Sequence, residues 1–134
     1  MGVLATNTRE LKFYYNSASS IGKQALGYIQ SSDKKVLAID VTSSRVTGTQ
    51  WMELADGLGI GVHELIDRTH PEFIKTYGRN LKVETDRDWL AILEKSPQLL
   101  RYPIILNGEN YCQIKELADV KIYLDSECTG LERG

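Results

Sequence analysis

A short polar segment near the N-terminus holds the residues best suited to chemistry. Residues 16–20 have the sequence Asn-Ser-Ala-Ser-Ser and separate an aromatic run from a helical pattern. The first turn of a helix offers free N–H groups and the positive end of the helix dipole, which favour an anion or a thiolate. A serine hydroxyl has no comparable thiolate form, and it becomes a nucleophile only beside a general base. The segment therefore predicts helix capping by Ser17, Ser19 or Ser20 rather than covalent chemistry.

The residues that most often assist such chemistry lie elsewhere in the sequence. Tyr15 precedes the segment, and both histidines, His63 and His70, fall far along the chain. Cys112 and Cys128 form no C-x-x-C pair, and two histidines are too few for a Cys/His zinc site of usual spacing, so we expect no metal site. We expect Cys112 to be a free, buried core residue and Cys128 to be an exposed residue of the tail. So few thiols indicate a reducing cytoplasm.

Hydrophobic periodicity predicts the elements that position this segment. Residues 11–15 are predicted as an aromatic strand, residues 21–30 as an amphipathic helix and residues 36–39 as a short buried strand. A strand, a helix and a strand over about 30 residues make a βαβ unit. The two strands should therefore be parallel and joined by a right-handed crossover.

A block of helices is predicted next. Thr47 and Gln50 match the capping-box pattern, an apolar face follows from Trp51 to Leu58, and Gly59 is a suitable stop. Three further helices are predicted from Val62 with Leu65 and Ile66, from Pro71 to Tyr77, and from Thr85 to a point before Pro97.

Strands return near the C-terminus. Residues 104–106 and 111–114 flank Asn107-Gly108, which is a strong hairpin signal. A last helix is predicted from Lys115 to Asp125, with Leu117, Val120 and Leu124 turned inward. A hairpin added to a parallel pair gives a mixed α/β sheet. Strand 11–15 should then run parallel to strand 35–40 and antiparallel to strand 103–106.

Several segments carry a further pattern. In chain order they are Tyr15-Asn16, Ser17 to Lys23, Gly59-Ile60 with Leu65-Ile66 and Arg68, Asp86-Arg87-Asp88 before Trp89-Leu90, and Arg101 to Ile105. Their order and spacing resemble the arsenate reductase (ArsC) family of thioredoxin-like proteins, which also contains the Spx-type transcription regulators. The resemblance runs from roughly Leu11 to Leu124. It implies one thioredoxin-like domain over residues 1–134, with a core at about 11–125, a four-stranded mixed sheet and a helical insertion at about 47–95.

The resemblance also implies a site. It places a nucleophilic cysteine where this chain has Ser19, a cis peptide before Pro103 facing the loop, and several arginines around an oxyanion. The chain departs from this pattern, because Lys23 stands where arginine is common and Tyr102 and Gln113 occupy two expected arginine positions. Two interpretations stay open for the cationic side chains that are present: they form an anion site, or they are ordinary solvated surface charges. The candidate ligand-binding residues are Asn16, Ser19, Ser20, Lys23, Arg68, Arg101 and Pro103.

We therefore expect a cytoplasmic ArsC-type protein that lacks redox activity and acts as a binding or regulatory module. The alternative is a glutathione-dependent arsenate reductase-like oxidoreductase with an atypical active site, so enzymatic activity stays open. We expect a protein partner, with an oxyanion or glutathione as a weakly bound ligand and no resident cofactor.

Composition narrows the classes of partner. Hydrophobic residues make up 42% and charged residues 25% of the chain, which excludes a disordered polypeptide. A net charge of -2 argues against a strongly basic nucleic-acid binder. No apolar run approaches the roughly 18 residues that a membrane span requires.

Overall fold

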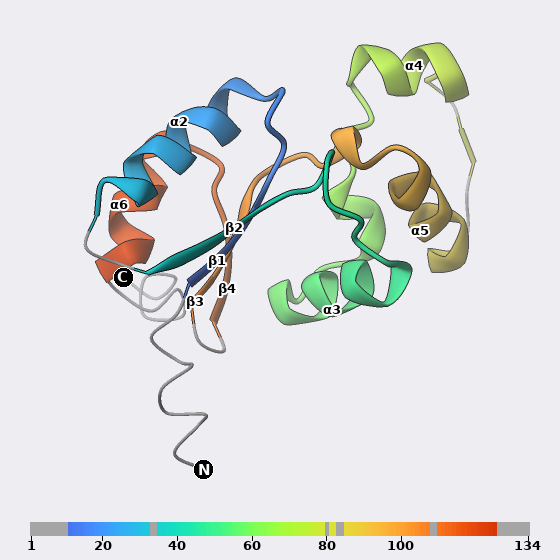
Figure 1. Cartoon of the computed structure of the whole chain (residues 1–134). Helices are drawn as coiled ribbons and strands as arrows, with labels where there is room; N and C mark the ends of the chain where they lie inside the picture. The colour runs from blue at the N-terminus through green and yellow to red at the C-terminus, as the bar shows by residue number, and fades with distance from the viewer. Residues whose placement is uncertain (1–10, 33–34, 80, 83–84, 108–109, 126–134) are drawn as a thin grey trace. The chain divides into compact units, whose positions relative to one another are not determined.

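The computed structural model describes residues 11–32, 35–79, 81–82, 85–107 and 110–125. Residues 124 and 125 are described by their backbone alone. The chain divides into two compact units, residues 1–40 with 102–134 and residues 41–101. Figure 1 shows the elements of both units, coloured along the chain. The first unit is therefore discontinuous in sequence, and the second is one continuous segment.

The first unit is built on a mixed four-stranded sheet in the order β2-β1-β3-β4. β1 (Leu11–Tyr15) pairs in parallel with β2 (Val36–Asp40) and antiparallel with β3 (Ile104–Asn107). β4 (Asn110–Gln113) pairs antiparallel with β3, and the turn predicted between them falls partly outside the described residues. The predicted α/β class and both predicted partners of β1 are confirmed.

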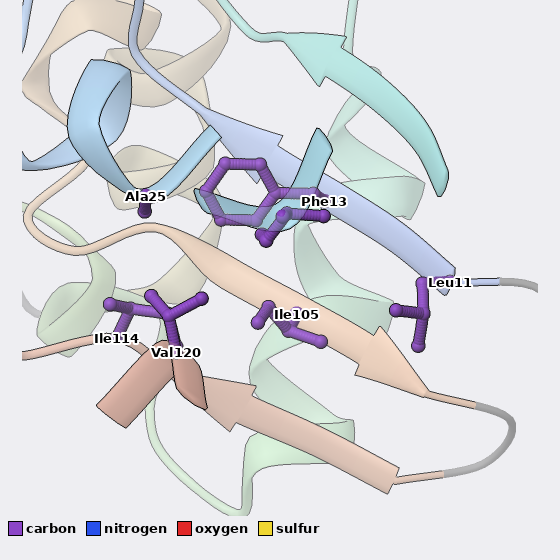
Figure 2. Close-up of a cluster of buried hydrophobic side chains, with 7 residues drawn as sticks. Leu11, Phe13, Ala25, Ile105, Ile114 and Val120 are labelled. Atoms are coloured by element: carbon purple, nitrogen blue, oxygen red, sulfur yellow. The ribbon is translucent and has the colours of Figure 1, made fainter. Parts of the chain in front are cut away.

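Two helices cover one face of this sheet, α2 (Ser20–Gln30) and α6 (Leu117–Asp125) (Figure 1). Alternate side chains of β1 point toward them, because successive residues of a strand face opposite sides. Removing such apolar side chains from water is the main driving force for folding. The buried cluster beneath the helices, drawn in Figure 2, draws on β1, α2, β3 and α6 and consists of Leu11, Phe13, Ala25, Ile29, Ile105, Ile114 and Val120.

The start of α6 differs from its prediction. The helix begins at Leu117 rather than at Lys115, because the carboxylate of Asp119 accepts hydrogen bonds from the N–H groups of Lys115 and Glu116 at 3.2 and 3.1 Å. Val120 is fully buried as predicted. Leu117 is 40% exposed, so its predicted inward orientation is wrong, and the side chain of Leu124 lies outside the described part.

The second unit is helical. Its elements are α3 (Gly48–Leu58), the 3-10 turn η1 (Val62–Leu65), α4 (Pro71–Tyr77), α5 (Asp86–Lys95) and the 3-10 turn η2 (Pro97–Leu99). α5 contacts α3, η1 and η2 and is the centre of the packing. An isolated antiparallel bridge joins Ile66, directly after η1, to Leu100, directly after η2.

Local signals set the helix ends of the second unit. The hydroxyl of Thr47 accepts from the N–H of Gln50 at 3.2 Å, and the Gln50 side chain accepts from the N–H of Thr47 at 3.0 Å, so the predicted capping box is confirmed. Gly59 ends α3 with φ 73°, in the left-handed region that favours glycine. Pro71 opens α4 and Thr85 caps α5, both as predicted. No helix in the described ranges is long and apolar enough to span a bilayer.

Candidate functional site

The polar segment 16–20 lies at the edge of the sheet where β1 and β2 both end. The two strands are parallel, and Tyr15 and Asp40 are register partners at their last position. Pro103 directly precedes β3, which begins opposite the end of β1, so Pro103 belongs to the same edge. Ligand sites of open α/β sheets gather outside the carboxyl ends of their strands.

Asn16 organises this segment. Its side chain is only 7% exposed. The side-chain Oδ1 accepts a hydrogen bond from the N–H of Ala18 at 2.8 Å, and the backbone oxygen accepts from the N–H of Ser19 at 2.9 Å. Buried polar groups require such partners. Asn16 therefore shapes the turn between β1 and α2 from the inside.

Ser19 caps α2, as predicted. Its backbone is extended, with φ -87° and ψ 135°, and its Oγ accepts from the N–H of Gly22 at 3.1 Å. Its backbone oxygen accepts from the N–H of Lys23 at 3.0 Å. The hydroxyl thus satisfies one of the free N–H groups at the start of the helix.

Gly22 is a residue that sequence reasoning missed. A Cβ atom at this position would lie 2.5 Å from the backbone oxygen of Asn16, much closer than side chains tolerate. The absence of a side chain therefore lets the first turn of α2 rest on Asn16. A glycine within an amphipathic helical pattern was the signal that could have found it.

Asp40 was also missed, and it places a negative charge at this edge. One carboxylate oxygen accepts from the N–H of Ser17 at 3.3 Å. Burial, and next the charge of Asp40, raise the pKa of the Tyr15 phenol above its usual value of 10.0. The same charge opposes the approach of an anion to the segment. An acidic residue directly after a buried strand is the sequence feature that marks it.

A small set of donors remains at the start of α2. Within the described residues, no hydrogen bond is formed by the N–H groups of Ser20 and Ile21. Ser20 and Lys23 are exposed, and Lys23 lies one turn into the helix. The structure therefore brings Asn16, Ser19, Ser20 and Lys23 together. Only some of the N–H groups of the segment are left without a hydrogen bond within the described residues.

Arg68 and Arg101 belong to the second unit. The Arg68 guanidinium lies 5.2 Å from the Trp89 ring centroid and 5.9 Å from that of Phe73, and Nη2 donates to the Leu81 oxygen at 3.0 Å. Such contacts between a cation and aromatic rings are stabilising, so this charge has a structural use. Arg101 is exposed, and its N–H donates to the Leu65 oxygen at 2.7 Å. Anion binding by the two arginines remains a prediction.

The two histidines also have structural uses in the second unit. His70 Nδ1 accepts from the N–H of Glu72 at 3.1 Å and caps α4. The His63 ring lies 6.3 Å from the ring of Trp89. In the described part of the chain, no three His, Cys, Asp or Glu side chains form a group that could hold a metal ion.

Two further expectations are wrong. The peptide bonds of the described ranges, the one before Pro103 included, are all trans, which is the favoured form of an X-Pro bond. Cys112 is buried as expected, with 4% exposure, but it is disulfide-bonded and not a free thiol. A disulfide depends on which residues meet in space, and sequence spacing does not reveal that.

Comparison with known proteins gives a clear result for the fold. No protein-family model matches the chain, and neither does any curated protein. Solved structures do match: the arsenate reductase from Vibrio cholerae has 14% identity and a TM-score of 0.73 over 85% of this chain and 97% of its own. The fold is thioredoxin-like. A putative arsenate reductase from Yersinia pestis has 18% identity and a TM-score of 0.72, covering 84% of this chain and 98% of its own.

A third match is a putative ArsC family related protein from Bacteroides fragilis, with 13% identity and a TM-score of 0.67 over 84% of this chain and 96% of its own. The chain therefore shares its thioredoxin-like architecture with proteins of the ArsC type over nearly the whole length of each. Fold alone does not fix an activity.

Proposed function

We propose that this protein is a member of the arsenate reductase family that acts by binding rather than by redox turnover. The observation that carries the proposal is Ser19. It stands where the resemblance places the nucleophilic cysteine, and its Oγ is used as the cap of α2. A serine cannot form the disulfide intermediates of a thiol relay.

The surroundings of Ser19 support this proposal. The carboxylate of Asp40, the acidic group at this edge, accepts from the N–H of Ser17. A serine nucleophile needs a base within hydrogen-bond reach of its hydroxyl, whereas the hydroxyl of Ser19 accepts a hydrogen bond from the N–H of Gly22. An atypical reductase, the alternative function, is therefore less well supported than a binding module.

A protein partner is the favoured ligand, with a regulatory role of the kind that the Spx branch suggests. The N–H groups of Ser17, Ala18 and Ser19 already donate within the segment, and Asp40 adds a negative charge. An oxyanion or the carboxylate of glutathione would be left with the N–H groups of Ser20 and Ile21 and the charge of Lys23. That smaller set supports weak anion binding, as a second candidate.

Reductase assays test the proposal directly. We expect no oxidation of glutathione or thioredoxin that depends on arsenate. In a background with both native cysteines changed to serine, Ser19→Cys should have a thiol pKa below the usual 8.5 or so, because the helix N-terminus favours the thiolate. Ser31→Cys, at the other end of the same helix, is the matched control. Iodoacetamide reactivity against pH measures both pKa values, and arsenate reduction by the unmodified protein would overturn the proposal.

Amide chemical shifts separate the two ligand classes. Sulfate, arsenate and glutathione should each shift residues 17–24 weakly, and Lys23→Ala should reduce these shifts. Lys35→Ala is the control, because Lys35 is exposed and lies at the opposite end of β2. If no shift occurs at millimolar ligand, the anion candidate is lost and protein docking remains.

A further inference from the structure

A cavity of about 210 Å³ lies within the second unit, and its lining contains none of the candidate ligand-binding residues predicted from the sequence. Its walls are the loop that follows β2, residues 41–46, together with Glu94 and Pro97. Val41 and Val46 are 1% and 6% exposed, so part of the lining is fixed in the apolar core. Pockets for drug-sized ligands usually have roughly 300–1,000 Å³, so this cavity suits a smaller molecule.

Two opposite charges line the cavity, those of Arg45 and Glu94. In the described part of the chain, the two side chains form no ion pair with each other, and the Arg45 guanidinium donates no hydrogen bond. Glu94 is held in position, because its Oε2 accepts from the N–H of Gly48 at 2.8 Å. Within the described residues its second oxygen, Oε1, accepts no hydrogen bond. The cavity therefore offers one donor group and one acceptor group of opposite charge to a ligand.

A ligand with one charge of each sign complements both groups. A carboxylate matches the planar guanidinium of Arg45 and can accept two hydrogen bonds from it. An ammonium group can donate to the carboxylate of Glu94. An anion without an ammonium group would be repelled by Glu94, and a cation without a carboxylate would be repelled by Arg45. The apolar surface of Val41, Val46 and Pro97 favours a short apolar side chain beside the two charges.

We propose that this cavity binds the zwitterion of a small apolar α-amino acid, with its carboxylate at Arg45, its ammonium group at Glu94 and its side chain on the apolar lining. Residues 42–44, whose side chains all carry hydroxyl groups, add donors and acceptors to the rim. All residues of this site belong to the second unit, so it does not depend on Ser19 or on the binding proposed at the start of α2. A ligand that binds only the folded state stabilises it, so the amino acid would stabilise the second unit.

Amide chemical shifts of the full chain test the proposal, with L-valine as the probe. We expect saturable shifts at residues 42–48 and 94–96, with half-saturation near about 1 mM, the weak end of the usual affinity scale. Isobutylamine lacks the carboxylate and isovalerate lacks the ammonium group. Each should bind at least about tenfold more weakly, because it leaves one charge of the cavity without a partner. Equal binding of either compound would overturn the zwitterion, and shifts confined to residues 17–24, or no saturable shift, would overturn the site.

Charge-removing variants keep the result specific. Arg45→Gln and Glu94→Gln should each weaken the binding of L-valine at least about tenfold. The amide oxygen introduced by Glu94→Gln can still accept from the N–H of Gly48, so the start of α3 should stay folded. Arg87→Gln and Glu53→Gln remove the same charges at exposed positions of this unit outside the cavity, and they should bind L-valine like the unmodified protein. Unchanged binding in Arg45→Gln and Glu94→Gln would overturn the role of the two charges.

Discussion

The N-termini of α2 and α3 show two ways of beginning a helix of the same length. Both helices have 11 residues, and both start with a hydroxyl cap, Ser19 or Thr47. α3 adds a reciprocal capping box, and the Glu94 carboxylate accepts from the N–H of Gly48 at 2.8 Å. Neither helix has an acidic residue in its first turn, and α2 leaves two N–H groups without a partner in the described part of the chain.

The difference separates a helix end with a reciprocal capping box from one that has a single side-chain cap, and the proposed oxyanion or glutathione ligand would bind at the second. At α3, exposed side chains accept hydrogen bonds from the N–H groups of Thr47, Gly48 and Gln50. At α2 the buried Asn16 and the close contact at Gly22 hold the segment rigid from beneath, while its outer side stays polar and open. A preorganised segment of this kind loses less entropy when it binds.

The largest effect should come from Gly22→Ala. The added Cβ would meet the backbone oxygen of Asn16, so we expect α2 to lose about 2 kcal/mol of stability against local opening, as in other overpacked sites. Hydrogen exchange of the α2 amides measures this free energy. If α2 keeps its stability in this variant, the close contact does not set the position of the helix.

Two other glycines provide matched controls for that prediction. Gly27→Ala adds its Cβ to open space on the same helix and should gain up to about 1 kcal/mol from helix propensity. Gly48→Ala places its Cβ 3.4 Å from the flexible Glu94 side chain and should change stability by less than about 0.5 kcal/mol. A loss of stability in Gly22→Ala, together with a gain in Gly27→Ala and little change in Gly48→Ala, would show that the close contact causes the loss. The low helix propensity of glycine alone would give a gain at each position.

Removing the two caps should have similar, smaller effects. Ser19→Ala and Thr47→Ala should each cost about 1 kcal/mol, because each leaves one N–H group of the first turn without its acceptor. Urea unfolding monitored by circular dichroism measures the loss. A much larger loss for Ser19→Ala alone would mean that its hydroxyl does more than cap α2.

The smallest effect concerns the ionisation of Tyr15. Asp40→Asn should lower the pKa of Tyr15 part of the way toward 10.0, because burial, the larger cause, remains. Since the folded pKa lies above the unfolded one, this contribution to stability is complete below pH 10.0 and is lost as the pH rises through the folded value. Nuclear magnetic resonance of labelled tyrosine follows the titration. An unchanged pKa in Asp40→Asn would remove Asp40 as a cause, and Asp56→Asn in the second unit is the control.

Helix caps and strand pairing were predictable, but individual contacts between the ends of different elements were not. The caps at Ser19, Thr47 and Thr85 need only a hydroxyl and a turn, so the sequence sufficed. The contact of Gly22 with Asn16 and the bond of Asp40 to Ser17 depend on how two strands and a helix end together. The pattern of residues 16–23 contains no sign of that packing.

Two of the failed expectations, the cis bond before Pro103 and the inward side chain of Leu117, have separate causes. The cis bond before Pro103 was implied only by the resemblance, and the local sequence gives no reason to depart from the trans form. The inward orientation of Leu117 came from extending the helical period back to Lys115, but Asp119 satisfies the two preceding N–H groups and delays the helix start.

The split of the first unit has a consequence for synthesis on the ribosome. β1 finds its parallel neighbour β2 within the first 40 residues, but its antiparallel neighbour β3 begins only at Ile104. The helical second unit is one continuous segment and is complete before β3 emerges. During translation the apolar sides of β1 and α2 therefore stay exposed until α6 and β3, which are made last, have been synthesised. A ribosome that stalls near Arg101 would leave a nascent chain with a finished helical unit and half a sheet, a form that chaperones would be needed to shield.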